Sequence, residues 1–250
     1  DESIQHKPVN AAMTSAFGSS CIFLPKRMIV FLQPGSGLIP AVGLGALYGN
    51  STGSYNVGIG QQALSSNTTA SYNTAVGYQA LNTNTFGSPN DAFGYQAMYS
   101  NTTGAYSTGV GHQALYSSNT DYNTGVGYIA GLNTTTGQAN AYFGSFAGSA
   151  ITTGGSNTCL GHGAGYSGTS LTTGYNNIYV GTNAGAATAA ETFAIVIGQN
   201  STSKGNSTGF INPQGGGVYQ GNNSSTWSQT SDQRLKKNIV NNDVGLEKLT

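Results

Sequence analysis

The sequence predicts an all-β protein, a parallel β-solenoid (β-roll) of about ten coils with 17 residues each. Three observations predict it: a phrase such as "NTAVGYQAL" at 73–81 recurs at a fixed pitch, one column of large apolar residues accompanies it, and asparagines that favour turns flank it. A period of 17 is too short for a pair of helices, but it suits one coil of a solenoid.

The pitch can be measured on the central glycine of each phrase. Successive copies lie 17 residues apart in seven of the nine intervals, and 16 and 20 apart in the other two. The ten central glycines are Gly43, Gly60, Gly77, Gly94, Gly111, Gly127, Gly144, Gly161, Gly181 and Gly198. With two or three short strands per coil, stacked at roughly 4.8 Å, ten coils would form a rod of about 48 Å.

Three columns around the central glycine predict the packing. The residue before it is always large and apolar, from Val42 to Ile197, which predicts a buried core stripe. The third residue after it is alanine in nine copies, which indicates close packing. The fourth is leucine or methionine as far as Leu115 and glycine from Gly131 to Gly185, which predicts a change of cross-section about halfway along the rod.

Two asparagine columns mark the predicted turns. Asparagine hydrogen-bonds its own backbone at chain corners and is therefore common there. The first column lies four residues before the central glycine and contains Asn56, Asn73, Asn90, Asn123, Asn140, Asn157 and Asn177. The second lies near seven residues after it and contains Asn50, Asn67, Asn84, Asn101, Asn119 and Asn133.

Other segments flank the array, which we assign to residues 41–201. Residues 1–40 would be a connector or cap, a buried strand pair, or part of a longer N-terminal region. Their apolar run, "CIFLPKRMIVFLQ" at 21–33, is interrupted by Pro25, Lys26 and Arg27 and is shorter than the roughly 20 residues of a spanning helix. Residues 202–230 form a bridge rich in Gly, Asn and Ser, and residues 231–250 read as a charged helical segment.

Composition argues against several classes of partner. Only 6% of the residues are charged, 38 of the 250 are glycine, and no Lys or Arg occurs between Val42 and Asn200. Nucleic acids and anionic membranes are held by clustered cations, so we expect no nucleic-acid binding and no membrane insertion. The two cysteines, Cys21 and Cys159, have no metal-ligand spacing. We expect neither a metal nor a cofactor.

The residues that could carry chemistry are scattered along the array. Asp91 and Asp121 lie in different columns, and Glu191 is far along the chain, so no carboxylate pair for glycoside cleavage is evident within one chain. His112 and His162 share a column but are three coils apart, or about 14 Å at strand spacing. Matches to a dinucleotide fingerprint, such as "GIGQQA" at 58–63, fall in the 17-residue repeat and predict no nucleotide site.

The segment Ser231–Ile239, "SDQRLKKNI", resembles the opening of the endosialidase-type intramolecular chaperone domain. Such domains lie at the C-termini of phage tail fibres and tailspikes, where they help three chains fold together and often cut themselves off. The resemblance implies that residues 231–250 are a truncated start of this domain. It also implies self-cleavage between Thr230 and Ser231, with Ser231 as the nucleophile and Lys236 as the assisting base.

The repeat block is similar to the head repeats of trimeric autotransporter adhesins, which are trimeric parallel β-rolls. Both resemblances imply a homotrimer. We therefore expect a structural and adhesive fibre subunit, located in a virion tail fibre or at a cell surface, which attaches to a host surface glycan or protein receptor. At most one enzymatic event, the self-cleavage, is expected.

Two other functions stay open at this point. One is a polysaccharide-degrading tailspike with an active site between chains. The other is an ice-binding or self-assembling filament, because Thr74, Thr108, Thr124 and Thr158 share a column, although Asp91 and Ala141 interrupt it. Sequons such as Asn50, Asn67, Asn101, Asn133 and Asn200 follow the turn columns, and the turn chemistry accounts for them.

Overall fold

The structure is a computed structural model that describes residues 20–23, 29–32, 40–213, 217–221 and 228–229. Two strands, β1 (Ser20–Phe23) and β2 (Ile29–Leu32), pair antiparallel. A second sheet contains β3 (Ala41–Val42), β4 (Val57–Ile59), β5 (Thr74–Val76), β6 (Asn90–Phe93), β7 (Ser107–Val110), β8 (Thr124–Val126), β9 (Ala141–Phe143), β10 (Thr158–Leu160), β11 (Ile178–Val180), β12 (Ile195–Ile197), β13 (Gly209–Ile211), β14 (Val218–Gln220) and β15 (Ser228–Gln229).

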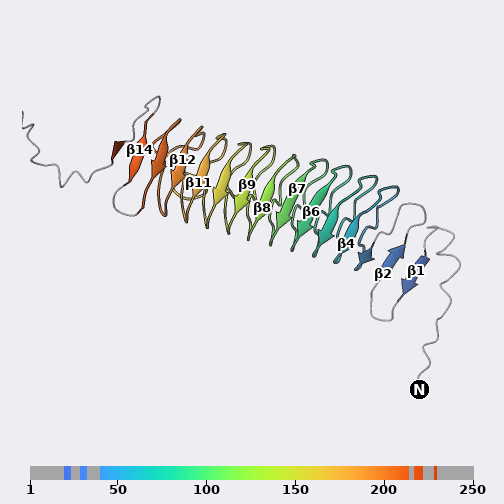
Figure 1. Ribbon diagram of the computed structural model, residues 1–250. Helices are drawn as coiled ribbons and strands as arrows, with labels where there is room; N and C mark the ends of the chain where they lie inside the picture. The colour runs from blue at the N-terminus through green and yellow to red at the C-terminus, as the bar shows by residue number, and fades with distance from the viewer. Residues whose placement is uncertain (1–19, 24–28, 33–39, 214–216, 222–227, 230–250) are drawn as a thin grey trace, which may run out of the picture.

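The long sheet is the spine of a solenoid. Strands β3 to β13 lie side by side in chain order and all run parallel, as the regular staircase in Figure 1 shows. The predicted all-β parallel solenoid of about ten turns is confirmed. The prediction of two or three strands per coil is wrong, because each described coil contributes one short strand and then a run of turns.

Hydrogen bonds between successive coils extend beyond the strands. On the sheet, the amide of Gly77 donates to the carbonyl of Ile59 at 2.7 Å, one coil back. In the turns, Leu64 donates to Ala80 at 3.0 Å and Ser66 donates to Asn82 at 3.0 Å, one coil ahead. Buried backbone groups require such partners, so the turns are as firmly stacked as the strands.

The central glycine is required by close approach of the coils. All ten central glycines have φ between +127° and +146°, a backbone conformation that residues with a side chain rarely adopt. A Cβ added at Gly94 would lie 2.3 Å from the carbonyl oxygen of Gly111 in the next coil. The glycine column therefore follows from the coil spacing and not from a ligand.

A tight corner follows each strand. In the coil after Gly77, Gln79 and Leu81 both have left-handed backbone conformations, with φ of 53° and 48°. Ala80 lies between them, fully buried, and its amide donates to the carbonyl of Gly77 at 3.4 Å. The alanine column is fully buried wherever it occurs, from Ala46 to Ala184, which confirms the predicted close packing.

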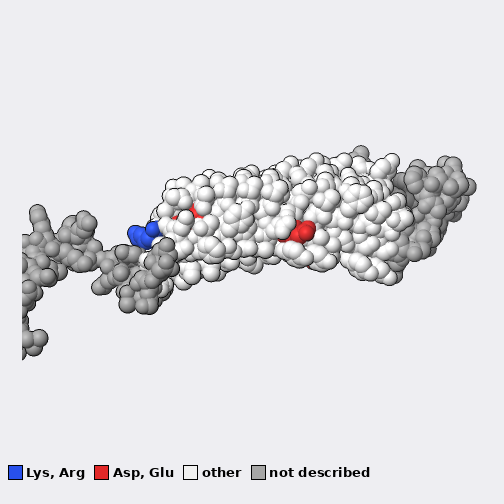
Figure 2. Space-filling view, turned by 90° about the horizontal axis from the view of Figure 1, so that it is seen from above, with Lys and Arg blue, Asp and Glu red and all other residues white. Residues whose placement is uncertain are grey.

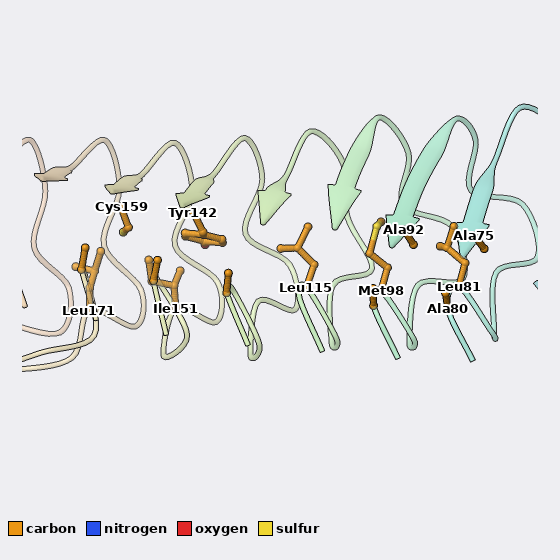
Figure 3. Close-up of a cluster of buried hydrophobic side chains, with 14 of the residues drawn as sticks. Ala75, Ala80, Leu81, Ala92, Met98, Leu115, Tyr142, Ile151, Cys159 and Leu171 are labelled. Atoms are coloured by element: carbon orange, nitrogen blue, oxygen red, sulfur yellow. The ribbon is translucent and has the colours of Figure 1, made fainter. Parts of the chain in front are cut away.

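The core lies between the strands and these corners. The strand residue that points inward is the second before the central glycine, and it is small in the first half of the rod, as at Ala75 and Ala92. Facing it, Leu81 and Met98 enter from the corner (Figure 3). A thin core of one large and one small side chain per coil results.

The second half of the rod reverses this arrangement. The inward strand residues now include the fully buried rings of Tyr142 and Tyr179, with the smaller Cys159 between them, while the corner residues become glycines. A Cβ on Gly148 would lie 2.2 Å from the Tyr142 ring, and one on Gly131 would lie 2.5 Å from it. The leucine-to-glycine switch thus compensates for larger residues on the opposite wall. The expected change of cross-section is therefore offset by an exchange of volume across the core.

A ladder of buried asparagines forms a second, polar part of the interior. Asn140 donates from its backbone amide to Oδ1 of Asn123 at 3.0 Å and from Nδ2 to the carbonyl of Gly154 at 3.0 Å. Its own Oδ1 accepts the backbone amide of Asn157 at 3.0 Å. Asn140 therefore connects its own coil to both neighbours, and Asn157 does the same, which explains the first asparagine column. Asn73 departs from this pattern, because its buried Oδ1 accepts no hydrogen bond.

Replacing Asn140 with alanine is expected to lower the free energy of unfolding by about 2–4 kcal/mol, because buried groups in three coils would lose their partners. The measurement is equilibrium denaturation followed by circular dichroism. The control is Asn133→Ala, at an exposed asparagine that makes one hydrogen bond, from Nδ2 to the carbonyl of Ser149, and it should lower the free energy of unfolding by no more than about 1.5 kcal/mol. Equal losses in the two variants would contradict the ladder as a source of stability.

The second asparagine column is shorter than predicted. Asn50, Asn67, Asn84 and Asn101 are buried in one line, which continues through Ser118 and Thr134. Asn119 and Asn133 were assigned to this line but are exposed. The reason is that the buried position falls one residue before Asn119 and one after Asn133. Burial also leaves the sequons at Asn67 and Asn101 without surface access in the folded protein.

The C-terminal end of the sheet reverses direction. Strand β14 pairs antiparallel with β13, and β15 pairs antiparallel with β14. A short reversed strand shields the edge of the parallel stack and reduces edge-to-edge pairing. The predicted helical segment at 231–250 lies outside the described residues.

Candidate functional site

The outer face of the long sheet presents an unbroken line of apolar side chains, named here the apolar row. Its members are Val42, Ile59, Val76, Phe93, Val110, Val126, Phe143, Leu160, Val180, Ile197 and Ile211, each paired with the next in the strand register. Five of the larger members, Ile59, Phe93, Phe143, Leu160 and Ile197, are 39–48% exposed. The prediction that this column is a buried core stripe is therefore wrong. Successive side chains of a strand point to opposite faces of the sheet, and the residue that precedes each member of the apolar row is the one that points inward.

A second column, two residues earlier, shares this face. It contains the threonines at 74, 108, 124 and 158, together with Asp91 and Ala141, and it ends in Ile178 and Ile195. We name it the threonine column. Asp91 is exposed and is the only charged residue in either column. The outer face is thus largely apolar or hydroxylated.

An aromatic ladder follows the central glycines. The rings of Tyr78 and Tyr95 stack with centroids 5.3 Å apart, and those of Tyr95 and His112 stack at 4.7 Å. Beyond His112 the ladder continues through Tyr128 at 5.3 Å to Phe146 at 5.4 Å. Stacked rings cover one another's faces and expose their edges. The stacked part of the ladder, from Tyr78 to His112, is consequently poorly arranged to stack on a sugar ring, whereas Tyr128 and Phe146 meet edge to face.

The two histidines belong to this ladder. His112 lies between Tyr95 and Tyr128, and the His162 ring lies 5.7 Å from that of Phe146. Among the described residues, no three His, Cys, Asp or Glu side chains are gathered as a metal site requires. Packing between aromatic rings accounts for both histidines.

The acidic side chains occupy three different environments. Asp91 is exposed on the sheet, and Asp121 accepts the backbone amide of Ala105 at 2.8 Å. Glu191 is fully buried, where its Oε2 accepts the Tyr179 hydroxyl at 3.0 Å and its Oε1 accepts the Ser203 hydroxyl. These hydrogen bonds give Asp121 and Glu191 structural roles, and within one chain the three acids do not form a pair.

Burial changes the ionisation of the groups near Glu191. Loss of solvent raises the pKa of Tyr179 well above its usual range, and the neighbouring carboxylate adds to this effect. Burial alone raises the pKa of the Cys159 thiol to about 12. Because only a thiolate is a good nucleophile, Cys159 is a small apolar core residue and not a reactive one.

The described surface has very few charges, and Figure 2 shows a nearly unbroken white face. The sequence has no cation between Val42 and Asn200, and Lys204 near the C-terminal end lies 4.6 Å from the centroid of the Phe210 ring. The predicted self-cleavage residues, Ser231 and Lys236, lie outside the described residues. No helix in the described part of the chain could cross a bilayer.

The chain was compared with models of protein families, with curated proteins and with solved structures, and none of the three comparisons gave a match. Among the described residues, the most prominent surface feature is the sheet face that carries the apolar row. Sequence reasoning assigned that row to the interior. Successive side chains of a strand point to opposite faces of the sheet. Because Ala75 and Ala92 point inward, the apolar row, one residue later, points outward.

Proposed function

We propose that this chain is a structural and adhesive fibre subunit, similar to a tail fibre, that forms a homotrimer and attaches to a host surface glycan or protein receptor. The observation that carries the proposal is the solenoid rod with its apolar row along one side. A contiguous apolar patch of this kind is uncommon on a monomeric soluble protein and is typical of association surfaces.

Mechanical roles suit a structure of this kind. Each coil is hydrogen-bonded to its neighbours through its strand, its corner and its asparagine ladder. Such a solenoid transmits load along its axis, and its variable turn residues can differ from coil to coil without altering the stack. In this proposal the receptor is bound by turn residues, and the protein belongs to a virion tail fibre or a cell surface.

The self-cleavage is part of the same proposal. The Ser231 hydroxyl oxygen would attack the carbonyl carbon of Thr230 while Lys236 accepts the hydroxyl proton, which requires a lysine pKa lowered by its surroundings. The peptide C–N bond would then break, its nitrogen would take the proton from Lys236 to become the amine of Ser231, and Thr230 would be held as an ester on Ser231. Water would hydrolyse this ester and divide the chain in two, without a cofactor. It would release residues 231–250 once the rod has assembled.

The proposal is tested on the purified full chain. Multi-angle light scattering should give about three times the chain mass of 25.5 kDa, and electron microscopy should show short rods. The fluorescently labelled protein should then bind cells from a panel of bacteria, and protease treatment or periodate oxidation of the cells would distinguish protein from glycan receptors. A monomeric mass would contradict the trimer, and a lack of binding to every cell type would contradict the adhesive role.

One observation favours a second candidate, ice binding. Thr74, Thr108, Thr124 and Thr158 all lie on the outer face of a regular parallel sheet. Thermal hysteresis measured by cryoscopy tests it, and Thr124→Lys should abolish any activity. The alternative of a polysaccharide-degrading enzyme would require acids from different chains to converge. Intact polysaccharide length after incubation with the assembled protein would contradict it.

A further inference from the structure

We infer that the apolar row is the line along which copies of this chain pack side by side, parallel and with equivalent coils at the same level. This inference rests on the proposed homotrimer and identifies its contact surface. The row runs through all the parallel strands, from Val42 in β3 to Ile211 in β13. A contact along it would span the whole rod.

The row supplies most of the exposed area that a stable association requires. Ile59, Phe93, Phe143 and Ile197 are 39–40% exposed, and Leu160 is 48% exposed. With the half-buried valines, the row and the isoleucines beside it present roughly 600 Å² of apolar surface. A standard interface takes about 800 Å² from each partner, and the neighbouring threonine column can supply the difference.

The chemistry of this face fits another copy better than an unrelated partner. The row has no charge, and its flank has only Asp91, so charge complementarity cannot select a partner. The partner has to be apolar and to repeat at the strand spacing of roughly 4.8 Å. A second copy of this chain meets both requirements at every level.

Three-fold symmetry fixes the axial register, because rotation about an axis along the rods places equivalent coils of the three chains at the same level. Two phenylalanines, Phe93 and Phe143, are separated by the smaller Val110 and Val126. Copies at the same level bring each phenylalanine opposite its equivalents, and these large pairs hold the rods apart at the valine levels between them. A flat crystal surface such as ice would instead require side chains of one size, which argues against it as the occupant.

Cysteine cross-linking tests the inference without disturbing the fold. The variant is Val126→Cys in a Cys21→Ser background, in which Cys159 is buried and unreactive. A direct disulfide needs Cβ atoms about 3.5–4.5 Å apart, so a short bis-maleimide reagent is used to bridge the gap that the phenylalanine pairs hold open. We expect most of the protein to run as cross-linked dimers on a denaturing gel, with one chain of each trimer left unpaired.

The matched control is Thr136→Cys, at an exposed position in the turns of the same coil. It should remain at least ten times less cross-linked than Val126→Cys. A second variant, Val110→Lys with Val126→Lys, should shift the light-scattering mass from trimer to monomer, whereas Thr136→Lys should not.

The outcomes separate this inference from the proposed function. A monomeric unmodified chain would overturn both. A trimer in which Val126→Cys does not cross-link, or cross-links no more than Thr136→Cys, would overturn the contact line alone. A trimer that retains its mass with both row lysines would do the same.

Discussion

Replacing Gly111 with alanine is expected to lower the free energy of unfolding by more than about 3 kcal/mol, the largest effect that we expect from a single methyl group in this chain. The added Cβ would lie 2.3 Å from the carbonyl oxygen of Gly127, and the backbone at Gly111 has a φ of +134°. Chemical denaturation followed by far-ultraviolet circular dichroism measures the loss.

A control separates the collision from the backbone strain. Gly205 also has a positive φ, +109°, but no atom lies within 4 Å of an added Cβ. Gly205→Ala should therefore lower the free energy of unfolding only by the backbone strain, about 1–2 kcal/mol. If both variants lose the same stability, the close approach of the coils is not the reason for the glycine column.

The second large effect concerns the exchange of volume across the core. Tyr142→Ala should destabilise the protein by about 3–5 kcal/mol, because it leaves a cavity between two glycines. Gly131→Leu with Gly148→Leu should also destabilise it, since both new side chains would collide with the Tyr142 ring. Combining all three changes should restore most of the stability, because the coil then resembles those around Ala92.

Backbone geometry does not prevent this rescue. Gly131 and Gly148 have φ of 63° and 59°, close to the 52° at which Leu115 occupies the same corner. The measurement is a thermodynamic cycle of unfolding free energies for the single, double and triple changes. Additive losses in the triple variant would show that the two walls of the core are independent, contrary to the structure.

The pitch of the fold could be read from the sequence, and the orientation of its strands could not. Glycine at the central position and alanine three residues later are each required by distances between backbones, so the printed sequence displays them directly. The direction of a strand residue depends on a choice between two faces. The inward column contains residues as different as Ala75, Tyr142 and Cys159. The outward row is uniformly large and apolar, which in sequence is also the pattern of a buried column.

Other differences follow from compensation and from local shifts. The change from Leu115 to Gly131 was visible, but its meaning depended on Tyr142, which occupies the opposite wall. Asparagine–threonine pairs occur at exposed as well as buried positions, so the sequence alone does not separate the exposed Asn119 and Asn133 from the buried column. For the candidate site, the ladder positions of His112 and His162 agree with their shared column. Ser231 and Lys236 remain predictions from resemblance.

The exchange of volume in the core also restricts how such a rod can change length during evolution. Within the first half, a whole coil can be duplicated or lost and its neighbours still meet a coil of the same kind. Between Leu115 and Gly131 this freedom ends, since a coil moved across that boundary would bring two large walls or two small walls together. The rod can thus grow on the N-terminal side of a fixed seam, and the seam should mark corresponding positions in relatives of different length.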